Sequence, residues 1–155
     1  MMEEIKVGDV FYELEPSITF CKIGSEDYVW GGIQYGEFEV IKVNEKSVRT
    51  KNLVEIGCGW GTKTRKEYLL KKHRSKEALL KTMRKRTPQL RKVYGKQLAK
   101  YTVKAQEYHV VKLWFYALDR LVEIEKSGLD IGVIEAANKS VGLFAAEVEK
   151  KVRKL

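Results

Sequence analysis

The sequence predicts an α+β protein in which a small N-terminal β-barrel is followed by helices. Two features of the pattern predict this class. Short alternating apolar segments with glycine turns fill the N-terminal half, whereas apolar residues recur at steps of three and four after Ser75. A third observation is that 44% of the 155 residues are apolar, which is enough to bury a core.

The N-terminal part, residues 1–74, predicts strands joined by tight turns. Gly8-Asp9 predicts a turn before a strand, and residues 38–52 predict a hairpin about Asn44-Glu45-Lys46-Ser47. The stretch SEDYVWGGIQYG, residues 25–36, predicts a loop with a glycine-rich tip. This tip carries the aromatic residues Tyr28, Trp30 and Tyr35. Several short strands with glycine corners favour a half-open barrel of the SH3 type.

The remaining residues, 75–155, predict a helical region that starts with a short basic helix. Ser75 is a suitable N-cap, because its hydroxyl can accept a hydrogen bond from a free N–H of the first turn. Glu77 follows in that turn, where the helix dipole favours a negative charge. The helix KEALLKTMRKR is therefore expected to begin directly after Ser75.

Two longer helices are expected to complete the helical region. Thr87-Pro88 predicts a new start, since proline at the first helical position loses no hydrogen bond. An apolar stripe then predicts one long helix over 88–126. The break SGLD precedes a second stripe, which predicts a C-terminal helix over 130–154. So short a connection favours an antiparallel helical hairpin.

Positive charge is concentrated in the middle of the chain. Residues 1–62 carry a net charge of −5, residues 63–104 carry +14 and residues 105–155 are neutral, giving +9 in total. Such segregation indicates an anionic partner or an acidic face of the same chain. Lysines spaced four residues apart repel each other and weaken a helix by about 0.2–0.5 kcal/mol per pair.

We therefore expect a basic helical face that contacts a nucleic acid or a nucleoprotein complex, chiefly through phosphates. Contacts to phosphate carry no sequence information, so selectivity for a base sequence is expected to be weak. The sequence does not decide between DNA and RNA as the partner. The expected contact residues are Lys81, Arg84, Lys85, Arg86, Arg91, Lys92, Lys96 and Lys100.

A protein partner is the alternative function. Either the helical hairpin or the aromatic tip would then contact an enzyme that the protein inhibits or regulates. The candidate contact residues of the tip are Tyr28, Trp30 and Tyr35. The segment LWFYAL, residues 113–118, is apolar on all sides of its helix, so it is either buried between helices or shared with a second copy in a homo-oligomer.

The stretch LVEIGCGWG, residues 53–61, resembles the first motif of class I S-adenosylmethionine-dependent methyltransferases. Glu55, Gly57, Gly59 and Gly61 match its acidic residue and three alternating glycines. The resemblance implies a cofactor-binding turn in a doubly wound sheet of seven strands. Helices are predicted where six further strands would be needed, and no acidic residue ends a second strand about 20 residues on. We interpret the match as coincidental and keep the methyltransferase as a third alternative.

No other constellation of catalytic or metal-binding residues is evident. The serines lack a nucleophile-elbow context, and Cys21, Cys58, His73 and His109 are too scattered for a zinc site. We expect a non-enzymatic protein without a cofactor or metal. The sequence has no run of eighteen apolar residues and no signal peptide, which favours the reducing cytosol and no membrane partner.

Three segments are similar to small phage and mobile-element proteins in which an SH3-like barrel leads through a turn into a helix. These segments are IKVGDVFYELE, FEVIKVNEKSVRTKN and YLLKKHRSKEALLKTMRKR, within about the first 85 residues. Some of these proteins are accessory factors and some are stoichiometric inhibitors of host or defence machinery. The resemblance therefore implies an accessory or inhibitory role for this chain.

Overall fold

The computed structural model describes residues 4–54, 56–57 and 63–155, and it has the predicted α+β class. The described strands form one antiparallel sheet in the order β1–β2–β3–β4. Their bounds are β1 Val10–Ile23, β2 Glu26–Val43, β3 Ser47–Asn52 and β4 Lys63–Arg65. The helices that follow are α1 Lys66–Leu69, α2 Lys76–Leu98, α3 Gln106–Lys126 and α4 Ile131–Arg153.

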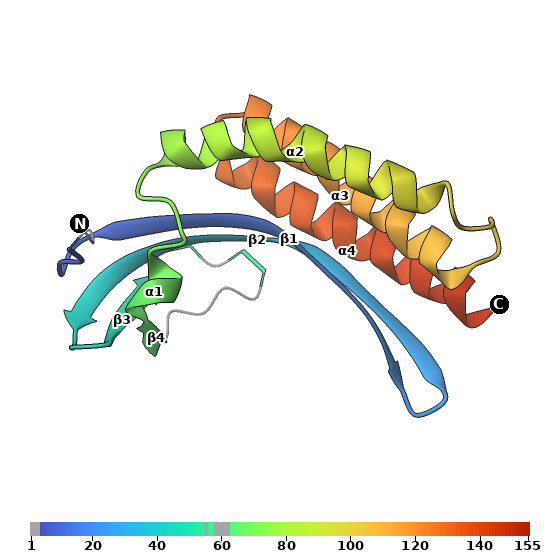
Figure 1. Cartoon of the computed structure of the whole chain (residues 1–155), viewed down its shortest axis with the longest axis horizontal. Coiled ribbons are helices and arrows are strands. Elements are labelled where there is room, and N and C mark those ends of the chain that lie inside the picture. The colour runs from blue at the N-terminus through green and yellow to red at the C-terminus, as the bar shows by residue number, and fades with distance from the viewer. Residues whose placement is uncertain (1–3, 55, 58–62) are drawn as a thin grey trace.

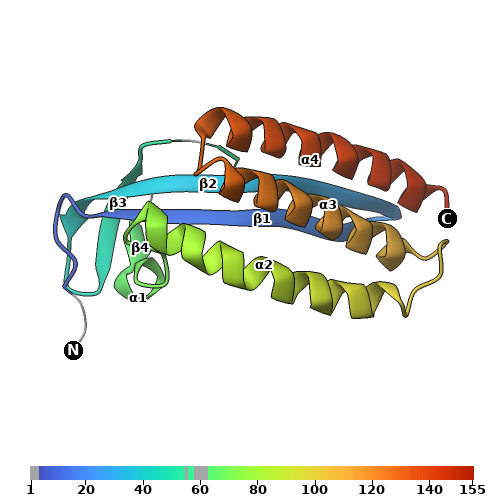
Figure 2. The ribbon, with the colours of Figure 1, turned by 90° about the horizontal axis from the view of Figure 1, so that it is seen from above.

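The long hairpin of β1 and β2 is the platform of the fold. It arches, and α2, α3 and α4 lie on the convex side of the arch (Figure 1). Seen from above, α3 lies between α2 and α4, and neighbouring helices run in opposite directions (Figure 2). The antiparallel hairpin of α3 and α4 is thus present, whereas α1, β3 and β4 lie on the concave side of the arch (Figure 1). The sheet is a curled half-barrel, and its SH3-like identity stays a prediction.

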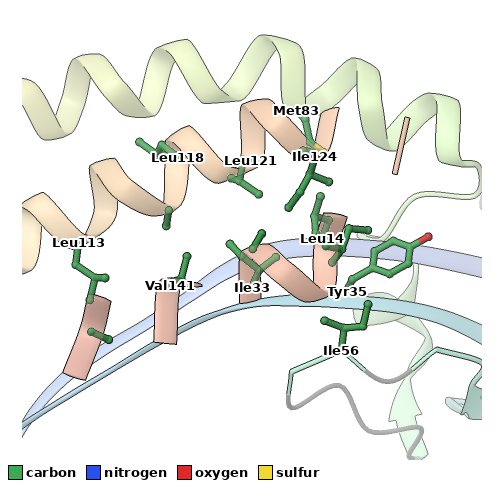
Figure 3. Close-up of a cluster of buried hydrophobic side chains, with 14 of the residues drawn as sticks. Leu14, Ile33, Tyr35, Ile56, Met83, Leu113, Leu118, Leu121, Ile124 and Val141 are labelled. Atoms are coloured by element: carbon green, nitrogen blue, oxygen red, sulfur yellow. The ribbon is translucent and has the colours of Figure 1, made fainter. Parts of the chain in front are cut away.

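One hydrophobic core joins the strands to the long helices. Leu14, Ile33 and Tyr35 of the β1–β2 hairpin are buried in the same cluster as Leu113 of α3 and Val141 of α4, and Ile33 lies beside Val141 (Figure 3). The residues predicted as a barrel, 1–74, and as a helical region, 75–155, therefore share this core. A smaller cluster fills the concave side of the half-barrel and consists of Ile5, Phe11, Val40, Val48 and Leu69.

Several turns and caps are those that the sequence predicts. The N–H of Asn44 donates to the carbonyl of Ser47 over 2.8 Å, which closes the β2–β3 hairpin. Ser75 caps α2 by accepting from the N–H of Ala78 at 3.1 Å. Asp130 was expected as the first residue of the C-terminal helix, but it is the N-cap of α4, and its side chain accepts from the N–H of Val133 at 3.1 Å. Local side-chain chemistry determines these positions, and it can be read from the sequence.

The expected loop over residues 25–36 is wrong, because residues 26–36 are a continuous part of β2. The chain turns earlier, at Gly24, whose φ of +64° favours glycine. Gly31 has a different role, since a Cβ there would lie 3.1 Å from the Cβ of Ala145 and 3.3 Å from Leu113. The glycines that suggested a loop thus include one that lets α3 and α4 approach the sheet closely.

The expected helix boundaries near Pro88 are also wrong. α2 runs without a break from Lys76 to Leu98 with Pro88 inside it, and the expected single helix over 88–126 is interrupted by residues 99–105. Leu79, Met83, Leu90 and Tyr94 continue one stripe across the proline, all packed into the main core. This shared burial outweighs the hydrogen bond lost at proline, which costs about 3 kcal/mol in a helix interior. The break at 99–105 lets α3 return along α2, so that both helices cover the same sheet.

The edge of β2 that β3 does not reach is covered by side chains of α4. The N–H of Val29 donates to Glu149 at 3.0 Å, and the N–H of Ile33 donates to the side-chain oxygen of Asn138 at 3.0 Å. Arg153 donates to the carbonyl of Asp27 at 2.9 Å. The helix thus supplies the donors and acceptors that a neighbouring strand would otherwise supply.

Candidate nucleic-acid interface

The candidate interface lies on α2, the helix beside the β1 edge of the platform (Figure 2). Its inward side buries Leu79, Met83 and Thr87. Its outward side carries four exposed lysines, Lys81, Lys85, Lys92 and Lys96, which we call the α2 row. The helical repeat places these four on one face, and fifteen residues at 1.5 Å each give the row a length of about 22 Å.

Two of the eight expected contact residues are engaged inside the protein. Arg84 forms an ion pair with Glu125, and Arg91 forms one with Asp119. Both acidic residues belong to α3, so these pairs join α2 to its neighbour. We therefore remove Arg84 and Arg91 from the proposed contact set.

The other six expected contact residues keep their charges unpaired within the described part of the chain. They are Lys81, Lys85, Arg86, Lys92, Lys96 and Lys100, and all six are exposed. α2 carries eight Lys or Arg residues against Glu77 alone, so its own sequence offers almost no compensation. The outward face of α2 is therefore strongly positive.

Acidic residues of the N-terminal part of the chain have partners other than the α2 row. Glu13 pairs with Lys72 at 2.7 Å, and Asp9 pairs with Arg74 at 3.3 Å. Glu37 accepts from Lys76 at 3.2 Å, at the first residue of α2. The acidic first part of the chain thus lies against the first cations of the basic block. The cations further along α2 remain outside these pairs.

A cleft of about 310 Å³ opens between α2, β1 and the segment 68–73. Arg86 of α2 lines it from one side, and Tyr68 and Lys71 line it from the segment. Tyr68 is 51% exposed, and the ammonium of Lys71 lies 5.2 Å from the centre of its ring. The expected contact set did not include Tyr68 or Lys71, although the sequence places the ring of Tyr68 among the basic residues, where it could stack. Both residues lie within the basic block of the sequence. Their position at the cleft depends on the fold, because α1 and the antiparallel bridge between His73 and Tyr12 bring them there.

Tyr94, the aromatic residue within α2, packs inside the protein. Tyr94 stacks on Trp114 of α3, with ring centres 4.9 Å apart and planes 15° apart. Burial raises the pKa of Tyr94 above its usual value, and the nearby Arg86 partly offsets this. Tyr94 is thus committed to the α2–α3 contact.

The three aromatic partner candidates separate into two groups. The prediction that Tyr35 contacts a partner is wrong, because its side chain is fully buried in the main core. Its hydroxyl donates to Glu37 at 2.7 Å, and burial followed by this carboxylate raises its pKa. Tyr28 and Trp30 stack on each other at 5.7 Å and 21°, and Trp30 is 51% exposed. They stand on the opposite face of β2 from Tyr35, because side chains alternate along a strand.

The apolar segment LWFYAL packs against other parts of the same chain. Trp114 faces α2 through Tyr94, whereas Tyr116 stacks on Phe144 of α4 at 4.5 Å. Leu113 and Leu118 are fully buried in the main core. A central helix flanked on both sides and from below needs apolar residues all round, so this segment carries no separate argument for a homo-oligomer.

Most of the methyltransferase-like motif lies outside the described residues, namely Glu55, Cys58, Gly59 and Gly61. Gly57 is described, and its φ of +80° places it in the left-handed region. In the described ranges, no three His, Cys, Asp or Glu residues come together as a metal site would need. Among the helices in the same ranges, none is long and apolar enough to cross a membrane.

No family model, no curated protein and no solved structure matches the chain.

Proposed function

We propose that the protein binds a nucleic acid through the outward face of α2, without catalysing a reaction. The observation that carries this proposal is the set of six exposed cations on and just after α2 that form no ion pair with described carboxylates. Phosphates are the natural partners of such a set, because each contact releases a condensed counterion.

The shape of the site favours backbone contacts over reading of a base sequence. The α2 row is straight and consists of lysines, whose flexible ammonium groups act as point charges. Arg84 and Arg91, which could grip a guanine edge through two hydrogen bonds, are paired with α3 instead. We therefore infer weak sequence selectivity and a role as an accessory factor on nucleic acid or on a nucleoprotein complex.

Affinity for nucleic acid is expected to fall steeply with salt. If all six cations contact phosphates, the logarithm of the association constant should fall with the logarithm of salt concentration with a slope of about −4 for a single strand and about −5 for a duplex. Between 0.05 M and 0.2 M salt, affinity for a single strand should drop by roughly several hundred-fold. Fluorescence anisotropy with labelled DNA and RNA oligonucleotides of random sequence measures this slope.

Absence of binding to DNA and RNA of either form at 0.05 M salt would remove the nucleic-acid function. A slope near zero for a complex that does form would show that phosphates are not its main contacts.

A protein partner is the second candidate function, and the exposed Tyr28–Trp30 stack favours it. Arg153 lies over the ring of Tyr28 at 4.9 Å, so a cation, a tyrosine and a tryptophan meet on one surface. Tyr, Trp and Arg are the residue types most enriched at energetic centres of protein interfaces. A partner enzyme inhibited or regulated through this surface would fit the alternative drawn from the sequence.

This second function predicts that Trp30→Ala abolishes capture of a specific protein from a nuclease-treated lysate of the source cells at 0.3 M salt. Trp30 is half exposed, so its removal should leave the fold intact. The matched control is Tyr68→Ala, which removes an aromatic residue of equal exposure elsewhere. A partner lost equally from both variants, or retained by Trp30→Ala, would argue against this surface.

A further inference from the structure

The cleft beside α2 combines an apolar floor with cations at its walls. Leu14, Leu79 and Met83 are buried residues of its lining. Arg86 and Lys71 stand on different elements of the lining, and neither forms an ion pair with another described residue. A ligand that fits must therefore have a flat or apolar body and at least one negative charge.

The charge of the cleft lining remains favourable to an anion. Of its two carboxylates, Glu13 is neutralised by Lys72 at 2.7 Å. Glu15 is exposed, and the lining also contains Arg86, Lys71 and His73. Glu15 also supplies an acceptor, which suits the amino group of a nucleobase.

The cleft is continuous with the α2 row. Thr82 lines the cleft and lies one helical turn from Lys85 and from Arg86, on the surface between the row and the cleft mouth. A strand that follows the row is thus led across Thr82 to Arg86. The half-exposed ring of Tyr68 is at the far wall, where a base can stack.

We propose that this cleft receives one unstacked nucleotide, so that the preferred ligand is single-stranded nucleic acid. Tyr68 stacks on the base, and Arg86 and Lys71 contact its phosphates. The volume of about 310 Å³ is of the size that encloses a small ligand. A duplex keeps its bases stacked and paired, so it can reach the α2 row but cannot place a base in the cleft. This inference rests on the proposed nucleic-acid function.

The test compares a labelled 15-nucleotide single strand with a 15-base-pair duplex in anisotropy titrations at 0.1 M salt. Tyr68→Ala should weaken single-strand binding by about tenfold or more and leave duplex binding within about twofold. Tyr68→Phe should restore single-strand binding, because it keeps the ring. Arg86→Gln should reduce the single-strand salt slope by about 0.7, the share of one phosphate contact.

Trp30→Ala is the matched control, since Trp30 is as exposed as Tyr68 but lies on the β1–β2 hairpin away from α2. Thermal unfolding of each variant verifies that Tyr68→Ala has folded. Equal affinity for both strand forms, with no effect of Tyr68→Ala, would overturn the cleft proposal and leave the α2 row as the interface. Failure of the unaltered protein to bind either form would instead remove the proposed function itself.

Discussion

Replacing Lys85 and Lys92 together by glutamate is expected to weaken nucleic-acid binding by about 10²-fold at 0.05 M salt. Each lost phosphate contact removes about 0.7 from the single-strand salt slope, which is close to tenfold in affinity per contact at this salt concentration. Both residues lie on the outward face of α2 and are exposed. Anisotropy titrations at several salt concentrations should show the lower affinity together with a slope reduced by about 1.4.

The Lys85→Glu and Lys92→Glu changes are expected to leave the fold intact, so that a loss of binding reports on the surface. Lys81 and Lys85 are four residues apart, as are Lys92 and Lys96, so each pair now repels. One reversal in each pair turns both repulsions into attractions, and the free energy of unfolding should stay equal or rise by up to about 2 kcal/mol. A variant that loses binding while gaining stability places the defect at the surface.

The matched control is Lys139→Glu with Lys150→Glu on α4. Both lysines are exposed, the change in net charge is identical, and α3 separates α4 from α2 (Figure 2). Binding should fall by less than about threefold through the general loss of positive charge. Equal losses in the two double variants would show that net charge, and not the α2 row, determines the affinity.

Tyr35→Ala is expected to lower the free energy of unfolding by about 3–5 kcal/mol. The side chain is 0% exposed and packs in the core between the sheet and the long helices. Its hydroxyl also donates to Glu37, which in turn accepts from Lys76 at the start of α2. Removing the ring leaves a cavity and takes a donor from this carboxylate. Urea denaturation followed by circular dichroism measures the loss.

Two comparison variants distinguish the contribution of the buried ring from that of its hydrogen bond and from that of an exposed aromatic side chain. Tyr35→Phe keeps the ring and loses only the hydroxyl, so the loss should be about 0.5–1.5 kcal/mol. Trp30→Ala removes a larger aromatic side chain, but from the uncovered face of β2, and should reduce stability by about 1 kcal/mol. A Tyr35→Ala variant as stable as Trp30→Ala would contradict the buried position of Tyr35.

Features set by neighbouring residues in the chain were predictable from the sequence. Ser75 caps a helix by a hydrogen bond to the residue three positions on, and Asn44 and Ser47 close a hairpin between themselves. The exposure of Lys92 and Lys96 also followed from helical spacing and charge, but their union with Lys81 and Lys85 in one row did not, because Pro88 was expected to divide the helix. In each case the cause and the consequence lie within a few residues of each other.

Features set by distant contacts were not predictable. Gly31 suggested a loop, yet it makes room for Ala145, more than a hundred residues away in the chain. Pro88 suggested a helix start, yet the stripe through Met83 and Leu90 holds the helix together by packing in the core. Arg84 and Arg91 were included in the contact set because their α3 partners are 41 and 28 residues further on. Only the tertiary structure brings such pairs together.

By bonding to the free edge of β2, α4 also prevents this strand from pairing with a strand of another molecule. An uncovered strand of this length would offer Val29 and Ile33 as templates for pairing with another chain, the first step towards fibrils. The oxygens of Asn138 and Glu149 occupy those positions instead. A chain that ends before Asn138 would lose both acceptors together with the buried Val141 and Val148 of α4, so we expect it to expose this strand edge and to aggregate.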